Sequence, residues 1–179
     1  PMVEGMGLVT MWQDLQRDAG ELTFEPVPFD HPLWVLYSSG TTGLPKPIVQ
    51  GHGGILLEHL KALSLHVDLT EEDRFFWLTT TGWMMWNLLV GGLLVGSTVI
   101  LYDGSPAHPD MYAIWRLAQE TGCTYFGVSA PYIQACMKAG IAPGSEFDLS
   151  RIRGVGSTGS PLSPEGFRWV YDNVHPNLV

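Results

Sequence analysis

Short apolar runs rich in β-branched and aromatic residues alternate along this chain with longer segments of helical periodicity. From residue 33 onward the pattern predicts strands at residues 33–37, 47–50, 74–79, 98–102, 124–128 and 152–156. It predicts helices near residues 52–66, 84–95, 109–120, 130–139 and 163–173. This alternation is typical of α/β proteins in which helices flank a mostly parallel β-sheet.

Residues that start or end helices mark several of these boundaries. Asp110, Ser129 and Ser163 each carry a side-chain oxygen that can cap a helix N-terminus. Gly122 and Gly140 suit helix ends, because glycine adopts a left-handed backbone without steric cost. The α/β prediction therefore rests on terminal signals as well as on periodicity.

The chain is expected to divide into a lead-in segment, residues 1–30, and a folded domain, residues 31–179. The lead-in contains one possible amphipathic helix around residues 8–17 and then a proline-containing stretch, residues 24–29, that should run extended. The chain starts without methionine and ends on an apolar pair, so we expect it to be a piece of a longer protein.

Composition narrows the classes of function. Among the 179 residues, 45% are apolar and 15% are charged, which fits a folded domain or part of one. The net charge is −9 and the Lys and Arg residues are scattered, which argues against a nucleic-acid partner. The most apolar stretch, residues 83–95, is interrupted and too short for a membrane span. Cys123 and Cys136 suggest no disulfide framework and favour a cytoplasmic setting.

The segment at residues 37–46 reads Tyr-Ser-Ser-Gly-Thr-Thr-Gly-Leu-Pro-Lys and can wrap an anion. Glycine lets the backbone approach closely, hydroxyls donate to phosphate oxygens and lysine adds positive charge. It is not a Walker A loop, because Pro47 and a second strand follow Lys46, which predicts a hairpin. The alternative is an ordinary turn. The phosphate-binding candidates are Ser38, Ser39, Gly40, Thr41, Thr42, Gly43 and Lys46.

Two further segments follow predicted strands, where open α/β sheets gather their ligands. In the first, Gly82, Trp83 and Met84 are candidates for walling a small pocket, whereas Met85 and Trp86 are expected to pack in the core. The second is a glycine-rich loop whose backbone can lie flat against a ring, with the alternative of a plain βα connection. Its cofactor-binding candidates are Ser157, Thr158, Gly159, Ser160 and Pro161.

Other polar residues are given little or no chemistry. His52, His59 and His66 recur every seven residues, about two helical turns apart and too far to share one metal ion, so solvent-facing or helix-end positions are expected. The acidic run at residues 71–73 is expected to be a solvated loop. No metal ligand is predicted, and Ser129 is a weak candidate at the border of the substrate region.

The loop ending in Gly-Leu-Pro-Lys resembles the signature of the acyl-adenylate-forming superfamily. The resemblance implies that the loop closes over the β- and γ-phosphates of ATP while a carboxylate attacks the α-phosphorus. It makes Thr41, Thr42 and Lys46 the candidate catalytic residues. It also implies Mg²⁺ on the phosphates and coenzyme A as a co-substrate.

Within that superfamily the chain is similar to short-chain acyl-CoA synthetases, in which a Gly-Trp pair closes the acyl pocket as Gly82-Trp83 would here. Their adenine loop usually reads Gly-Glu-Pro, whereas this chain has Gly159-Ser160-Pro161. Residues 29–32, 51–54 and 79–86 instead resemble the members that activate acetoacetate. The implied reaction forms an acyl-adenylate and then acetoacetyl-CoA.

Alternatives stay open at this point. Acetate or propionate is the second choice of substrate, and the chain could instead be a nucleotide-binding module or an inert fragment that self-associates through a sheet edge. The family continues into an acidic Mg/ATP motif, a ribose-binding aspartate, a hinge and a C-terminal domain with the adenylation lysine. We therefore expect this chain alone to turn over poorly or not at all.

Overall fold

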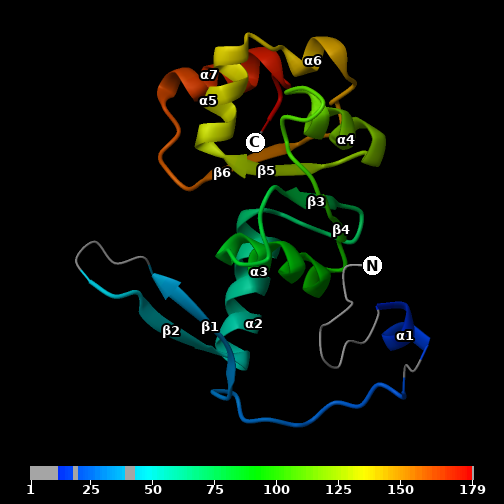
Figure 1. Cartoon of the computed structure of the whole chain (residues 1–179), viewed down its shortest axis with the longest axis vertical. Helices are drawn as coiled ribbons and strands as arrows, with labels where there is room; N and C mark the ends of the chain where they lie inside the picture. Colours follow the sequence, from blue (N-terminus) through cyan, green and yellow to red (C-terminus); the bar gives the residue numbers. More distant parts are fainter. Residues whose placement is uncertain (1–11, 18–19, 39–42, 179) are drawn as a thin grey trace, which may run out of the picture.

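The computed structural model describes residues 12–17, 20–38 and 43–178, and a parallel four-stranded sheet lies at its centre (Figure 1). The strand order is β4-β3-β5-β6, and each neighbouring pair is parallel. The strands are β3 (Arg74–Trp77), β4 (Thr98–Ile100), β5 (Tyr125–Ser129) and β6 (Gly154–Thr158). The α/β class predicted from the sequence is confirmed.

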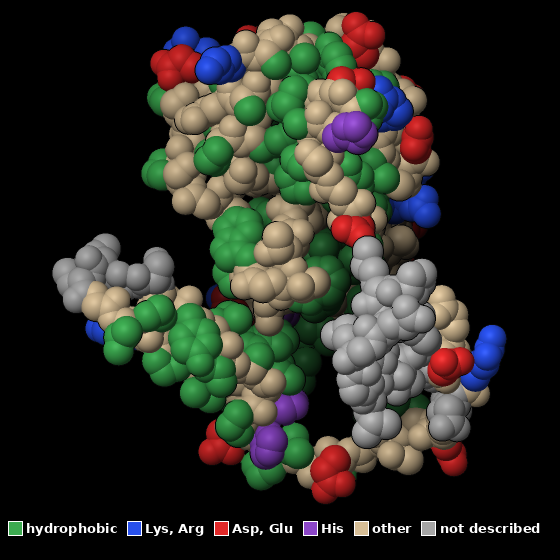
Figure 2. Space-filling view, viewed as in Figure 1, with side chains coloured by type: hydrophobic (Ala, Val, Ile, Leu, Met, Phe, Trp, Pro, Cys, Tyr) green, Lys and Arg blue, Asp and Glu red, His purple; other side chains and the backbone are tan. Residues whose placement is uncertain are grey.

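The first two strands form a separate antiparallel hairpin rather than joining this sheet. They are β1 (Pro32–Ser38) and β2 (Lys46–Gly51), and their register pairs Ser38 with Lys46. The hairpin predicted from Pro47 is therefore confirmed. Figure 2 shows apolar side chains gathered over it, and the exposed ones include Val35, Tyr37 and Val49.

Helices cover both faces of the parallel sheet (Figure 1). One face packs against α4 (Ala113–Thr121), α5 (Ala130–Ala139) and α7 (Pro164–Asn173), with the short α6 (Pro143–Glu146) beside them. The other packs against α3 (Met84–Gly91) and a π-helix, η1 (Lys61–His66), which continues α2 (His52–Leu60). A 3₁₀ turn, η2 (Gly92–Val95), follows α3, and a short α1 (Trp12–Arg17) lies in the lead-in. None of the helices in the described part could cross a membrane.

The two-residue period of the strands sorts the core into two clusters. Phe76 of β3 and Phe126 of β5 point to the α4–α7 face, where Trp115 stacks on Phe126 at a centroid distance of 4.4 Å. Phe75 and Trp77 point to the α3 face. A sheet buried on both sides explains why its strands read as apolar runs.

Most predicted helix ends are confirmed. The Ser129 and Ser163 side chains accept hydrogen bonds from the backbone N–H groups of Tyr132 and Gly166. Gly122 and Gly140 end their helices with φ of 63° and 67°. The prediction of a helix starting near residue 109 was wrong. Asp110 caps a turn, accepting from the N–H of Tyr112 at 2.9 Å, and α4 begins at residue 113.

The acidic run at residues 71–73 is solvated only in part, which corrects the sequence-based expectation. Glu71 and Glu72 are exposed, but Asp73 is buried. Its carboxylate accepts from the Arg153 guanidinium at 3.0 Å and from the Thr124 hydroxyl at 2.7 Å. Burial raises the pKa of Asp73, but the hydrogen bonds from Arg153 and Thr124 outweigh it and lower the pKa to about 2. This ion pair ties the start of β3 to the segments before β5 and β6.

His59 lies in the last turn of α2, as the helix-end expectation has it, but it is buried rather than solvent-facing. Its ring lies 5.9 Å from that of Trp34 in β1 and packs on Gly91, where a Cβ would come within 2.5 Å of Nδ1. Burial lowers the pKa of His59. The histidine is therefore a packing residue between the hairpin and α3.

Candidate active site

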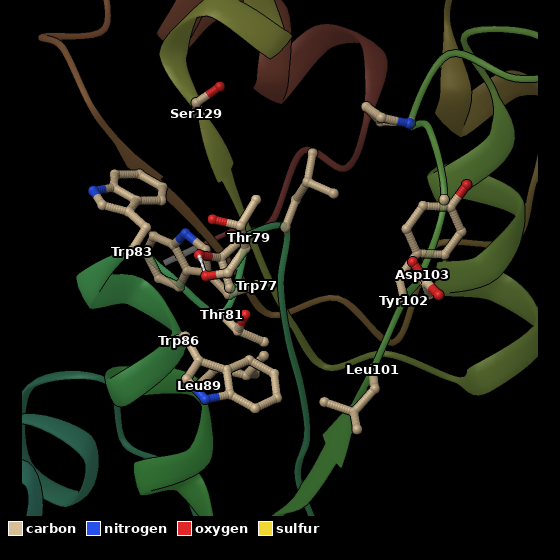
Figure 3. Close-up of a pocket in the computed structure, with 14 residues that line it drawn as sticks. Trp77, Thr79, Thr81, Trp83, Trp86, Leu89, Leu101, Tyr102, Asp103 and Ser129 are labelled. Carbon is tan, nitrogen blue, oxygen red and sulfur yellow. Dashed lines mark hydrogen bonds between the residues drawn. The ribbon is translucent and has the colours of Figure 1, made fainter. Parts of the chain in front are cut away.

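The carboxyl ends of β3, β4 and β5 open into one cleft of about 900 Å³ (Figure 3). Parallel strands bring their carboxyl ends to the same edge, so segments distant in sequence meet there. One wall comes from residues 77–81, Trp83, Trp86 and Leu89, and the facing wall from residues 101–104 and Pro106. Ser129, at the end of β5, completes the lining.

Trp83 brings two of the predicted sites together. It precedes the first residue of α3 and is 36% exposed. Gly159 has φ of 88°, a left-handed conformation that favours glycine, and a Cβ there would lie 4.0 Å from Trp83 Cη2 and from Ser129 Cβ. The Gly-Trp turn and the glycine-rich loop are thus neighbours beside the cleft.

The methionines beside Trp83 lie in different surroundings. Met85 is buried in the core, as expected. Trp86 packs against the same core cluster and also lines the cleft. Met84 is 46% exposed and is not among the described residues that line the cleft, so its predicted acyl contact has no support from this geometry.

The facing wall was missed by the sequence reasoning. Tyr102, Asp103 and Gly104 follow β4, whereas the predicted strand ran to residue 102, so the position of Asp103 and Gly104 after that strand was the signal that could have found this wall. The Tyr102 hydroxyl donates to the Ser105 carbonyl at 2.8 Å. Asp103 is the charged residue among the described lining, and no Lys or Arg accompanies it. A bound anion would need positive charge from elsewhere.

The phosphate-binding candidates that the structure describes, Ser38, Gly43 and Lys46, lie at or beside the ends of the hairpin strands β1 and β2. None of these three lines the cleft. In Figure 1 the two strands project away from the four-stranded sheet. Lys46 is exposed, and a Cβ on Gly43 would meet no atom within 4 Å. Ser38 pairs with Lys46 in the hairpin register. The predictions for Ser39, Gly40, Thr41 and Thr42 lie outside the described residues.

The glycine-rich loop also lines a second cavity. Ser157, Ser160 and Pro161 line a cavity of about 390 Å³ between β6 and α7. Ser157 Oγ is buried without a hydrogen-bond partner among the described residues, whereas Thr158 pairs with Ser129 in the sheet. The loop therefore borders the cleft through Gly159 and the second cavity through its serines.

The described residues offer no resident metal centre. No group of three or more His, Cys, Asp or Glu side chains comes together among them in a way that could hold an ion.

Comparison with known proteins decides the family. The sequence profile described as "AMP-binding enzyme" matches residues 7–179. The chain belongs to the AMP-binding enzyme family. The resemblance to the acyl-adenylate-forming superfamily seen in the hairpin signature is thereby confirmed.

Within the AMP-binding enzymes, the chain is similar to proteins that form acyl-CoA products. It is 52% identical to acetoacetyl-coenzyme A synthetase of Rhizobium meliloti (strain 1021), covering 89% of this chain and 25% of that protein. It is 42% identical to malonamoyl-CoA synthetase of Penicillium aethiopicum, covering 84% and 23%.

A solved structure supports the same relationship. Acetoacetyl-CoA synthetase from Streptomyces lividans superposes with a TM-score of 0.84 at 62% sequence identity, covering 91% of this chain and 25% of that one. The chain thus spans about a quarter of the length of these AMP-binding relatives.

Proposed function

We propose that this chain is part of an ATP-dependent acid–CoA ligase that activates acetoacetate. Residues 31–179 would form part of its N-terminal AMP-binding domain, and residues 1–30 a lead-in. The observation that carries the proposal is the 62% identity to the Streptomyces lividans acetoacetyl-CoA synthetase over 91% of this chain. The Gly-Leu-Pro-Lys motif of the hairpin also supports it.

The reaction has two balanced steps. A carboxylate oxygen of acetoacetate attacks the α-phosphorus of ATP, and pyrophosphate leaves with the electron pair of the broken P–O bond. The thiol sulfur of coenzyme A then attacks the acyl carbon, loses its proton and displaces AMP. Magnesium carried by the ATP phosphates would supply charge neutralisation in the first step.

The cleft would bind the acyl group, and the hairpin would bind the phosphates of ATP. The cleft lining is uncharged apart from the acidic Asp103, so it suits the short acyl group better than a triphosphate. Lys46 and the loop hydroxyls of Thr41 and Thr42 would bind the β- and γ-phosphates. Catalysis at this stage is positioning and charge neutralisation, which require the hairpin to meet the nucleotide at the mouth of the cleft.

Acetoacetate is favoured over acetate or propionate because similar proteins are acetoacetyl-CoA synthetases. Ser160 also favours it, since short-chain synthetases usually have glutamate at that position. Acetoacetyl and malonamoyl groups both carry a carbonyl at the third carbon, which acetyl and propionyl groups lack. Trp83 would close the pocket end and exclude long acids sterically. Coenzyme A and the remaining ribose and lysine contacts would involve parts of a longer protein, so the 179-residue chain alone is expected to turn over poorly.

The test uses a chimera in which this chain replaces the matching quarter of the Streptomyces lividans protein. Changing Thr41, Thr42 and Lys46 together to alanine should lower acetoacetate-dependent pyrophosphate release by about 10³-fold or more, because the phosphates lose their donors. Lys138→Ala, at an exposed lysine in the last turn of α5, is the control and should leave the rate near that of the chimera. An undiminished rate in the triple variant would contradict the proposal.

A further inference from the structure

Trp77, at the end of β3, carries a hydrogen-bond donor with no partner. Its side chain is 7% exposed and its indole Nε1 is fully buried, yet no acceptor lies within hydrogen-bond distance among the described residues. An indole N–H usually finds a partner when buried, because an unmade hydrogen bond is costly. The residue also lines the cleft.

The sheet holds this indole in one place. Gly127 and Gly156 lie under its six-membered ring, and a Cβ on either would come within 2.2 or 2.7 Å of ring carbons. Tyr125 stacks against it at a centroid distance of 6.5 Å, and Phe75 meets it edge-on at 6.3 Å. The ring atoms nearest to the two glycines are carbons, and Nε1 is not among them.

Figure 3 shows Trp77 among the side chains of Thr79, Thr81 and Trp83. All four residues line the same cleft. Two other donors of the lining are already engaged, because Tyr102 donates to Ser105 and the Thr79 hydroxyl donates to the Thr80 carbonyl. The indole N–H of Trp77 is therefore available for a ligand acceptor.

We propose that Trp77 Nε1 donates a hydrogen bond to the carbonyl oxygen at the third carbon of the acid substrate, and so selects β-oxo acids over simple short acids. This inference rests on the proposed function and names a specificity-determining residue of the same cleft. A polar atom held inside an apolar site discriminates strongly, because a substrate without the matching group leaves that atom unpaired.

The test compares acetoacetate with butyrate, which has the same chain length but no oxo group, in the same chimera. Trp77→Phe removes the donor and keeps an aromatic ring. The ratio of kcat/KM for acetoacetate to that for butyrate should fall by about 10-fold or more, because only acetoacetate loses a hydrogen bond. Replacing Trp77 with benzothienylalanine, which exchanges N–H for sulfur in the same bicyclic shape, should lower the ratio likewise.

Trp115→Phe is the matched control. Trp115 is also a fully buried tryptophan whose Nε1 has no partner in the described part, but it lies in the core on the other face of the sheet. It should leave the ratio unchanged whatever its effect on stability. An unchanged ratio in both Trp77 variants would overturn the inference and leave the proposed function intact. A folded, unsubstituted chimera that makes no acetoacetyl-adenylate would overturn both.

Discussion

The parallel sheet and the β1–β2 hairpin bury their apolar side chains to very different extents. The sheet is covered on both faces, so Phe126 and Val128 are fully buried. The hairpin leaves Val35 and Val49 about half exposed, and Figure 2 shows its apolar surface. The core of the sheet therefore holds the walls of the cleft in place within this chain. The position of the phosphate-binding candidates depends instead on what the hairpin contacts.

The largest effect is expected in the core between the sheet and α4. Phe126→Ala should destabilise the chain by about 3–5 kcal/mol, because it removes a ring stacked between Trp115 and the sheet and leaves a cavity. Urea unfolding followed by far-ultraviolet circular dichroism measures the change. A loss below about 1 kcal/mol would mean that the sheet is no more tightly built than the hairpin.

A smaller effect is expected at the buried ion pair. Arg153→Leu should cost about 2–4 kcal/mol at pH 7, because Asp73 stays buried without its guanidinium partner. The control Arg151→Leu, at an exposed arginine two residues earlier, should change stability by less than about 0.5 kcal/mol.

The same pair predicts a pH dependence. The folded-state pKa of Asp73 is about 2, below its ordinary 3.8, so its contribution is complete above pH 3.8 and is lost as pH falls toward 2. Without Arg153, burial raises the pKa of Asp73 against only the hydrogen bonds from Thr124 and Thr70, so the acid loss of stability should begin at higher pH. Identical acid profiles for the two proteins would contradict the role assigned to the pair.

The smallest effect is expected on the hairpin. Val49→Ala should cost less than about 0.5 kcal/mol in this chain, since Val49 is 59% exposed. The matched change Val128→Ala, at a fully buried position of β5, should cost about 2 kcal/mol or more. Equal losses in urea unfolding would show that the hairpin is as well packed as the sheet.

Local signals in the sequence predicted the local features well. The caps at Ser129 and Ser163 and the glycine ends at Gly122 and Gly140 depend on neighbouring residues alone. The hairpin likewise followed from Pro47 after Lys46. Such features need no knowledge of distant contacts, so one sequence suffices.

Long-range features were less predictable. Asp73 reads as part of an acidic loop until Arg153, eighty residues later, is placed beside it. The wall formed by Tyr102 and Asp103 becomes visible only when β4 lies next to β3. His59 reads as a surface residue until Trp34 covers it. Each case depends on a pairing that periodicity does not encode.

The glycines beneath Trp77 also affect how the preferred chain length of the acid substrate could change during evolution. Because Gly127 and Gly156 have no side chains, the wall at this point is one indole thick, with bare peptide planes behind it. Trp77→Val would deepen the chamber. Adding methyl groups at positions 127 and 156 would then refill it, so these three sites should drift together.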